Sequence, residues 1–591
     1  MIGLAVSGGV DSTALAVLCH GLTREHRHQR KPHLAVKFKA FIVDHNAREG
    51  SSEEAERVRG RLKRLTPRIL SLAWPSNVKP LDLPHFETQA RTLRYQALGT
   101  ACRDHGCDYL MVGHHKDDHA ETVMMRLASG HTSRGILGIR PHTDLPECWG
   151  IHGVHRSGLC EANSQRLWIK HLQGQRVLSD IAPKNLIFER GGIQLLRPLI
   201  TFNKKRLMET CRANAVKWEE DSTNAEPWRT PRNAVRKFFQ SYKLPVALRK
   251  DSMLALSNQN RKYIGIQMSV AENELNQCDV SVFDLRSGRL VVRLPNRASP
   301  EDGARSHTYK TELRVSTAFL LRELAYAVSP LEDIAFGSME PAVMSIYPEL
   351  FDGQNLMHQP TSFTTGGVHF QRLPWPLSQH RIDPRPRDSR KSVPEMERLN
   401  PDFVWQLTRQ PLSNELPSFT IPPIRVNPSL LSDSDTYPPD MYPMSSDSPW
   451  SPWQLWDGRY WIRVLNRLTQ HLVVRPLQRS DLRVIEATIG GDRYKVLRKL
   501  LGAAAPNKIR WTLPAIAQVD DSQPSLSRVL ALPTLGPGGH LAVVNEKGHK
   551  RLEWQVRYKK PYPGFRIDRK SNTSRPLRLQ SDPAYMPTWN D

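Results

Sequence analysis

The N-terminal part of the chain is predicted to be an α/β domain built on a parallel sheet. Four short apolar runs, each suited to a buried strand, alternate with segments of helical periodicity; the runs are residues 2–6, 40–43, 69–72 and 109–112. Such alternation favours βαβ units with helices on both faces of the sheet. Polar residues follow three of these runs, at the edge where open α/β sheets bind ligands. We therefore expect a binding site at that edge.

The first strand is followed by a glycine-containing loop and an apolar run that can continue as a helix. The loop consists of Ser7, Gly8, Gly9, Val10, Asp11 and Ser12. Glycines let the backbone approach an anion, which the start of the helix also attracts, and the two serines add hydroxyl donors. A carboxylate repels bare phosphate, so Asp11 is expected to hold Mg²⁺ or to orient a neighbour. A plain Ser/Gly turn is the competing interpretation, and the missing lysine argues against a γ-phosphate transfer loop.

The following elements bring further charged residues to the same edge. The second strand ends at Asp44, and residues 53–65 and 86–103 are expected to be helices, the second carrying Arg91 and Arg94. The fourth strand leads into a helix that begins near Asp117. On this helix Asp118 and Glu121 are three residues apart and therefore lie on the same face. Acid groups there could hold Mg²⁺ or an amine. A zinc pair of His115 and His119 is disfavoured, because no Glu follows the first His, and a solvated helix start is also left open.

Seven motifs in order over about 230 residues resemble the tRNA(Ile)-lysidine synthetase family, whose N-terminal domain is a PP-loop ATP pyrophosphatase. They are the loop at 7–12, Val43-Asp44-His45, Glu87-x3-Arg91-x2-Arg94-Tyr95, residues 114–122, Gly130-x4-Gly135-x2-Gly138, residues 196–199, and residues 220–224 followed by Arg232-Asn233-x2-Arg236. The chain departs from the family at His119, where Gln is usual, and in an insertion at about 140–194. Cys148, His152, His155 and Cys160 of the insertion form a zinc-like set, although a plain surface loop is favoured.

The resemblance implies a reaction and its participants. ATP would adenylate O2 of the wobble cytidine in a tRNA(Ile) with a CAU anticodon, and free L-lysine would displace AMP; Mg²⁺ is the expected metal, held by Asp11. The implied ATP-binding residues are those of the loop at 7–12, and the implied catalytic residues are Asp11, Asp44, Arg91, Arg94, Asp117, Asp118 and Glu121. The four acids after Asp11 are not ordered by role. The residues expected to contact tRNA are Arg197, Arg229, Arg232, Asn233 and Arg236.

Five regions are expected along the chain. They are a catalytic domain over 1–245, a tRNA-holding domain over 246–373, a disordered Pro/Ser-rich linker or long insertions over 374–452 without a core of its own, an α+β tRNA-binding domain over 453–570, and a flexible tail over 571–591. The segment from Gly130 to Gly138 is expected to be a flexible loop near the target base. Basic and aromatic residues from Trp554 to Arg566 are expected to contact nucleic acid.

Composition bounds the partners and the compartment. The 591 residues carry a net charge of +24, which favours a polyanionic partner. Seven irregularly spaced cysteines indicate a reducing compartment, and no apolar run is long enough for a membrane span. Since the first strand begins at Ile2, no room is left for a cleavable presequence, so either the protein stays where it is made or Met1 is not the native start. An intracellular location is expected: mitochondrial by resemblance for a eukaryotic chain, and cytoplasmic otherwise. A homodimer, a tRNA thiolation enzyme using Cys102 and Cys107, and a non-catalytic RNA-binding protein are left open.

Overall fold

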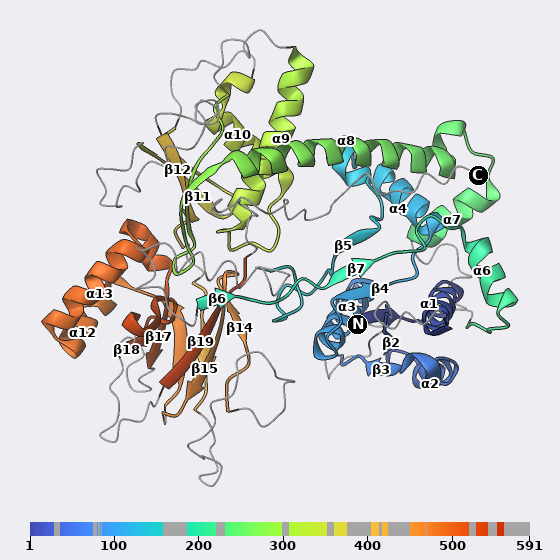
Figure 1. The fold of residues 1–591 in the computed structure, drawn as a ribbon, viewed down its shortest axis with the longest axis horizontal. Coiled ribbons are helices and arrows are strands. Elements are labelled where there is room, and N and C mark those ends of the chain that lie inside the picture. The colour runs from blue at the N-terminus through green and yellow to red at the C-terminus, as the bar shows by residue number, and fades with distance from the viewer. Residues whose placement is uncertain are drawn as a thin grey trace. The chain divides into compact units, whose positions relative to one another are not determined.

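The computed structural model forms two compact units, which are described separately (Figure 1). Unit 1 comprises residues 1–156 and 190–264, and unit 2 comprises residues 157–189 and 265–591. The structure describes residues 1–28, 36–74, 80, 83, 85–157, 186–219, 231–297, 306–351, 360–374, 403–412, 416–423, 449–468, 470–518, 528–539, 541 and 552–560. Cys160, the motif at 220–224, Arg229 and the tail at 571–591 lie outside these ranges. In the described residues no helix is long and apolar enough to cross a membrane.

Unit 1 contains the predicted parallel sheet. Its strands, in spatial order, are β3 (Arg68–Ser71), β2 (Phe38–Asp44), β1 (Ile2–Ala5), β4 (Tyr109–Met111), β7 (Gln194–Leu196) and β5 (His142–Asp144). All neighbours are parallel except β5, which pairs antiparallel with β7. The direction of strand succession reverses between β1 and β4, and crevices at such a reversal are where doubly wound sheets bind ligands.

Helices cover both faces of the sheet, as predicted. Ala40 and Ile42 of β2 belong to a core with α1 (Val10–His28), α2 (Ser51–Arg61) and α6 (Lys204–Ala213). The intervening Phe41 belongs to a second core with α3 (Phe86–Asp104). Successive side chains of a strand point to opposite faces, so this division places the two cores on opposite sides of the sheet.

The first part of the insertion is not a surface loop, contrary to the favoured interpretation. It contributes β5 to the sheet, and Leu145, Cys148 and Val154 are completely buried in the core with α3. The Cys148 thiol donates a hydrogen bond to the Tyr95 carbonyl at 3.4 Å. Among the described residues no cluster of three or more His, Cys, Asp or Glu could hold a metal ion. Packing therefore accounts for Cys148, and the remainder of the proposed zinc set includes Cys160, which is not described.

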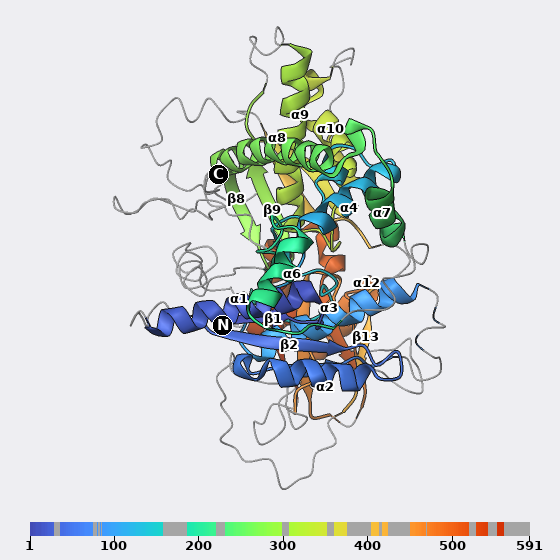
Figure 2. The ribbon, with the colours of Figure 1, turned by 90° about the vertical axis from the view of Figure 1, so that its right-hand side faces the viewer.

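The remaining helices of unit 1 form a group at one end of the sheet, which Figures 1 and 2 both show. They are α4 (Lys116–Ala128), α7 (Pro231–Ser241) and the part of α8 (Lys250–Gln277) up to Ile264. Val123 and Met124 of α4 pack with Met253 of α8 and with partly buried aromatic residues of α7. Because α4 begins directly after β4, this packing connects the helical group to the ligand-binding edge of the sheet.

Unit 2 contains three sheets within its described residues. The first has the order β10 (Ser362–Thr365), β11 (Val368–Pro374), β12 (Phe403–Arg409), β9 (Arg289–Arg293) and β8 (Asp279–Asp284), and it is accompanied by α9 (His307–Tyr326) and α10 (Glu340–Ile346). The second has the order β13 (Phe419–Ile421), β16 (Leu472–Pro476), β17 (Pro514–Gln518) and β18 (Arg528–Ala531), with α12 (Arg479–Ile489) and α13 (Gly491–Ala504). The third has the order β14 (Gln454–Trp456), β15 (Tyr460–Asn466), β19 (Leu552–Tyr558) and β6 (Leu186–Phe188).

Two expectations for unit 2 are wrong. The region 374–452 is not only a linker, because β12 is an interior strand of the first sheet, with Val404, Trp405 and Leu407 buried. The expected nucleic-acid contact of residues 554–566 is wrong for Lys559 and Lys560, which are at most 1% exposed, with Lys559 paired with Glu189 at 3.3 Å; residues 561–566 of that segment lie outside the described residues. The ammonium groups of these two lysines are satisfied inside the protein.

A buried arginine joins separate elements of unit 2. Arg459 is completely buried and donates to the carbonyls of Ser287, in the β8–β9 turn, and Thr512, before β17, at 2.9 and 2.8 Å. Its charge is balanced by Asp457 at 2.7 Å, which also accepts from Arg409 of β12. A buried charge is tolerated only when it is paired and hydrogen-bonded, so this network fixes how the turns meet.

We predict that Asp457→Asn destabilises unit 2. Asn tolerates the left-handed backbone at this position (φ 48°) but leaves the two arginines without their shared anion. Breaking a buried ion pair in this way costs about 3–5 kcal/mol. Denaturant unfolding followed by tryptophan fluorescence would measure the loss. Asp492→Asn, whose carboxylate is 98% exposed, is the control, and equal midpoints for the two variants would contradict a structural role for the network.

Candidate active site

The loop between β1 and α1 is held in shape by its own hydrogen bonds. Gly8 has φ 87°, and a Cβ there would lie 2.6 Å from Val58 Cγ2, so only glycine fits. The buried Ser12 hydroxyl donates to the Gly9 carbonyl at 3.0 Å and accepts from the Ser7 N–H at 3.2 Å. Ser12 therefore shapes the loop rather than offering a free hydroxyl, and the first turn of α1 is left to attract an anion.

A second glycine brings the start of α4 against this loop. A Cβ on Gly113, which follows β4, would lie 2.8 Å from the Asp11 carbonyl carbon and 2.9 Å from the Ser12 nitrogen. No other residue allows two backbones to approach so closely. The N-termini of α1 and α4 consequently adjoin, so the loop at 7–12 lies close to the acidic pair after His115.

His115 connects the two helix starts. Its Nδ1 accepts the backbone N–H groups of Asp117 and Asp118 at 3.2 and 3.4 Å, so it is the N-cap of α4. Because Nδ1 is an acceptor, we assign the ring hydrogen of the neutral imidazole to Nε2. That nitrogen lies 3.6 Å from Asp11 Oδ1 and 3.5 Å from Asp118 Oδ2. His115 thus faces two carboxylates on different helices. Sequence reasoning considered it only as a zinc ligand, although its place before two acids is typical of an N-cap.

The Asp11 carboxylate has a buried oxygen, Oδ1, that accepts no hydrogen bond from the described residues. Burial raises the pKa of Asp11, an effect that the nearby His115 and Lys204 partly offset. Such an oxygen is expected to have a ligand in the working protein, and a cation would restore its charged form.

The other predicted acids differ in how many hydrogen bonds their carboxylate oxygens already accept from the protein. Asp44 accepts from Ser51, Ser52 and the Asn46 N–H, and Asp117 accepts from Lys250 at 2.6 Å and from the Lys204 N–H at 3.0 Å. Burial raises the pKa of both Asp44 and Asp117, but the hydrogen bonds outweigh it, so the pKa of each carboxyl group is lowered overall. Asp44 therefore orders the loop before α2, and Asp117 ties α4 to α6 and α8.

Asp118 and Glu121 also diverge. Glu121 is 2% exposed and accepts two bonds from Arg236, at 2.9 and 3.1 Å, so its charge is neutralised. Asp118 accepts the His115 N–H through Oδ2 at 3.1 Å, whereas no described residue donates a hydrogen bond to its Oδ1. Arg236 Nη2 lies 4.0 Å from this Oδ1, so Asp118 keeps an oxygen that accepts no hydrogen bond from the described residues but faces a positive charge.

The predicted arginines are likewise divided. Arg94 is near His114, whose pKa is lowered to about 4 by burial first and then by the charges of Arg197, Arg232 and Arg94, against the opposing effect of Asp118. Arg91 instead pairs with Glu147 at 3.3 Å and lies over the Tyr95 ring. Arg94 also lies over the Tyr95 ring, at 5.4 Å, but forms no ion pair with a carboxylate of the described residues.

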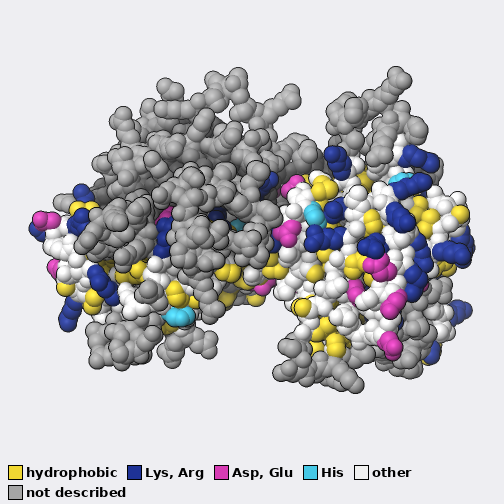
Figure 3. Space-filling model, turned by 90° about the horizontal axis from the view of Figure 1, so that it is seen from below, with side chains coloured by type: hydrophobic (Ala, Val, Ile, Leu, Met, Phe, Trp, Pro, Cys, Tyr) yellow, Lys and Arg dark blue, Asp and Glu magenta, His cyan; other side chains and the backbone are white. Residues whose placement is uncertain are grey.

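The residues predicted to contact tRNA are only partly available. Arg197 is 9% exposed and donates to the Arg140 carbonyl, Thr143 and His114, so it fastens β5 to the sheet. Asn233 is buried, and Arg236 is occupied by Glu121. The Arg232 side chain is 41% exposed, although it also reaches Thr122 at 3.3 Å. On the face seen in Figure 3, Lys and Arg side chains are spread among Asp and Glu over the described surface, with no single patch.

His119, where the chain departs from the related family, anchors the glycine segment, residues 130–139. Its Nδ1 accepts the Ile139 N–H at 2.9 Å, and Nε2 lies 3.4 Å from the Ser257 hydroxyl of α8. Gly138 packs so closely that a Cβ would lie 2.4 Å from the imidazole. The segment is therefore fastened to α4 and α8, includes a 3₁₀ turn over Ser133–Ile136, and is less free than the glycine content predicted.

Comparison with known proteins shows which families the chain is similar to. Residues 1–241 match the PP-loop domain family. A Schizosaccharomyces pombe protein named "Probable tRNA(Ile)-lysidine synthase" is 26% identical over 553 residues, which are 93% of this chain and 94% of that protein. The tRNA(Ile)-lysidine synthase of a Wolbachia endosymbiont of Brugia malayi is 24% identical, covering 75% of this chain and 84% of its own length. That of Methylobacterium nodulans is 32% identical over 226 residues, 38% of this chain and 49% of the relative.

We predict that His119 makes the chain sensitive to acid. Burial, together with Arg261 and Arg126, lowers the pKa of His119 to about 4. The imidazole of an unfolded chain has a pKa of about 6.5, so below that pH protonation favours the unfolded chain. The free energy of unfolding is therefore highest above about pH 6.5 and falls by on the order of 2–3 kcal/mol as the pH drops toward 4. His119→Gln, which can still accept the Ile139 N–H, should be less acid-sensitive.

Urea midpoints measured from pH 7 to 4.5 would check this prediction. The exposed His131 provides the control, because His131→Gln removes an imidazole from the same segment and should leave the wild-type profile unchanged. Parallel profiles for wild type and His119→Gln would show that the buried imidazole does not titrate as expected.

Proposed function

This chain is a PP-loop protein homologous to tRNA(Ile)-lysidine synthases, and from that premise we propose that it makes lysidine at the wobble cytidine of a tRNA(Ile) with a CAU anticodon. In the first step, O2 of the cytidine attacks the α-phosphate of ATP and pyrophosphate leaves. In the second, the ε-amine of free L-lysine bonds to the activated carbon, AMP leaves with the former O2, and the amine gives up a proton. The products are lysidine, AMP and pyrophosphate.

The observation that carries this proposal is the oxygen of Asp11. It is buried beside a glycine loop suited to phosphates and accepts no hydrogen bond from the described residues, while Asp118 approaches the same imidazole, His115, from the neighbouring helix. Most buried polar atoms have a hydrogen-bond partner, so a bound ligand is a natural explanation for this oxygen.

Mg²⁺ fits this arrangement. Asp11 would hold it together with phosphate oxygens of ATP, and proteins usually bind Mg²⁺ through one or two carboxylates and substrate phosphates rather than through a cage of side chains. That mode agrees with the lack of a three-ligand cluster in the described residues. When bound, the metal would neutralise charge on the phosphates.

The chain's own residues supply the remaining functions. The first turn of α1 and the loop N–H groups bind phosphate oxygens, and Arg94 stabilises the negative charge that grows as pyrophosphate leaves. Asp118 Oδ1 is the acceptor for the lysine proton, because Asp44, Asp117 and Glu121 already accept strong hydrogen bonds. His115 Nε2 faces both carboxylates, at 3.6 Å from Asp11 Oδ1 and 3.5 Å from Asp118 Oδ2.

A thiolation activity has less support. It would require accessible cysteines to carry sulfur, and reactive thiols are found in exposed, electropositive surroundings. Cys102 and Cys107, the nearest candidates, are 0% and 3% exposed within the core beneath α3. A purely RNA-binding role leaves the Asp11 oxygen unexplained.

The proposal is tested by pyrophosphate release with Mg-ATP, the CAU tRNA and lysine, together with detection of lysine-labelled tRNA. Release that yields lysine-labelled tRNA is expected. Incorporation of sulfur instead, or tRNA binding without any release, would refute the proposal.

Asp11→Asn should reduce pyrophosphate release roughly a hundredfold or more, because the neutral amide no longer attracts the metal and its phosphates. Its tRNA affinity in a gel shift should stay native. Asp251→Asn, which removes an 89% exposed carboxylate from α8, is the control and should remain active. Native turnover in Asp11→Asn, or loss of tRNA binding by it, would contradict the assignment of Asp11 to the nucleotide site.

A further inference from the structure

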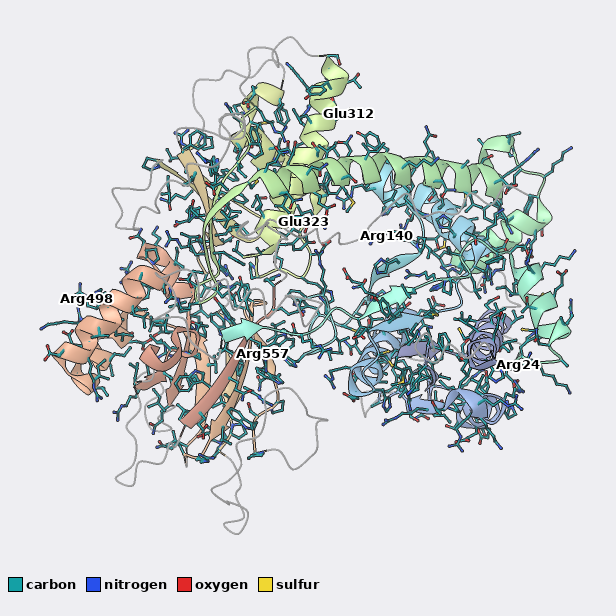
Figure 4. All side chains as sticks on the ribbon, viewed as in Figure 1. Arg24, Arg140, Glu312, Glu323, Arg498 and Arg557 are labelled. Atoms are coloured by element: carbon teal, nitrogen blue, oxygen red, sulfur yellow. The ribbon has the colours of Figure 1, made fainter. Side chains whose placement is uncertain are left out.

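Three arginines surround the glycine segment without an acidic partner. Arg126 lies near the end of α4, Arg140 directly before β5, where Figure 4 labels it, and Arg261 on α8. No carboxylate of the described residues forms an ion pair with any of the three. This sets them apart from Arg236 in the same unit, which pairs with Glu121.

Carbonyl groups alone hold the two partly buried members. Arg126 Nη1 donates to the Gly135 and Gly138 carbonyls at 3.0 and 3.2 Å, and Arg261 Nη2 donates to those of Leu137 and Ile139 at 3.2 and 3.3 Å. Each guanidinium has five N–H donors, so most of them remain available. Arg261 Nε is buried and has no hydrogen-bond partner among the described residues.

The three positive charges oppose one another. Burial, and after it the charge of Arg140, lowers the pKa of both Arg126 and Arg261. Desolvated like charges are unfavourable unless an anion joins them, and planar guanidinium groups match phosphate oxygens in geometry. A purely structural role could explain Arg126 and Arg261, but not Arg140, whose exposed side chain makes no hydrogen bond or ion pair with the described residues.

We propose that Arg126, Arg140 and Arg261 bind a backbone phosphate of the tRNA substrate. This inference rests on the proposed function, which supplies the tRNA. Arg126 follows Asp118 by eight positions along α4, which corresponds to a rise of about 12 Å along the helix axis. The cluster is therefore distinct from the loop at 7–12 and would hold the RNA strand beside the base that enters the active site. A phosphate contact of this kind positions the strand and carries no sequence information.

Arg140→Gln is the most direct test, because the side chain is exposed and the Arg140 carbonyl that accepts from Arg197 at 2.8 Å is retained. We expect affinity for the CAU tRNA transcript to fall about tenfold at 0.1 M salt, and the slope of log affinity against log salt to decrease by about one. A tRNA with another anticodon should lose a similar factor. Affinity for Mg-ATP should not change, and Arg140→Lys should recover most of the loss.

Arg24→Gln is the matched control, since it removes one exposed positive charge from α1 of the same unit (Figure 4). It should keep native tRNA affinity and salt slope. Native tRNA binding by Arg140→Gln would overturn the inference while leaving the proposed function intact, and so would a loss of ATP binding equal to the loss of tRNA binding. Failure of the unmodified chain to bind tRNA would overturn both.

Discussion

The close approach of two backbones, at Gly113 and at Asp11–Ser12, is the constraint on which the site depends. Neighbouring β1 and β4 bring the two loops to the same edge of the sheet, but only the absent Cβ of Gly113 lets them touch. That contact sets two helix N-termini side by side, so both direct the positive ends of their dipoles to one place. His115 can then cap α4 and still face Asp11.

The site contains many charges but leaves few of them available. Lys250 neutralises Asp117, and Arg236 neutralises Glu121, which fastens α7 and α8 to the start of α4. Such buried pairs act mainly by holding groups in position, since their desolvation offsets much of their attraction. Asp11 and Asp118 remain, and their proximity to one imidazole gives the site its chemical character. The glycine segment extends this arrangement with arginines that lack anions.

The sequence could predict the parallel sheet and the meeting of the two loops, because strand–loop–helix order fixes which residues lie at a sheet edge. It could not predict which acidic side chains are paired with a basic residue of the same protein. The partner of Glu121 is 115 residues away and that of Asp117 is 133 residues away, so neutralisation depends on tertiary packing. Strand β12 was missed because its seven residues lie in a region rich in Pro, Ser and Asp, and because one of its partners, β9, comes from a distant part of the chain.

The central claim is that the loop at 7–12 and the start of α4 form one site through Gly113. The most direct measurement is tRNA- and lysine-dependent pyrophosphate release by Gly113→Ala, compared with Gly60→Ala, whose added Cβ would meet nothing within 4 Å. The account predicts that Gly113→Ala lowers the rate of pyrophosphate release on the order of a hundredfold, because the loop at 7–12 and the start of α4 no longer align. Its tRNA affinity should stay native, and the control Gly60→Ala should keep a native rate. A native rate in Gly113→Ala would contradict the account.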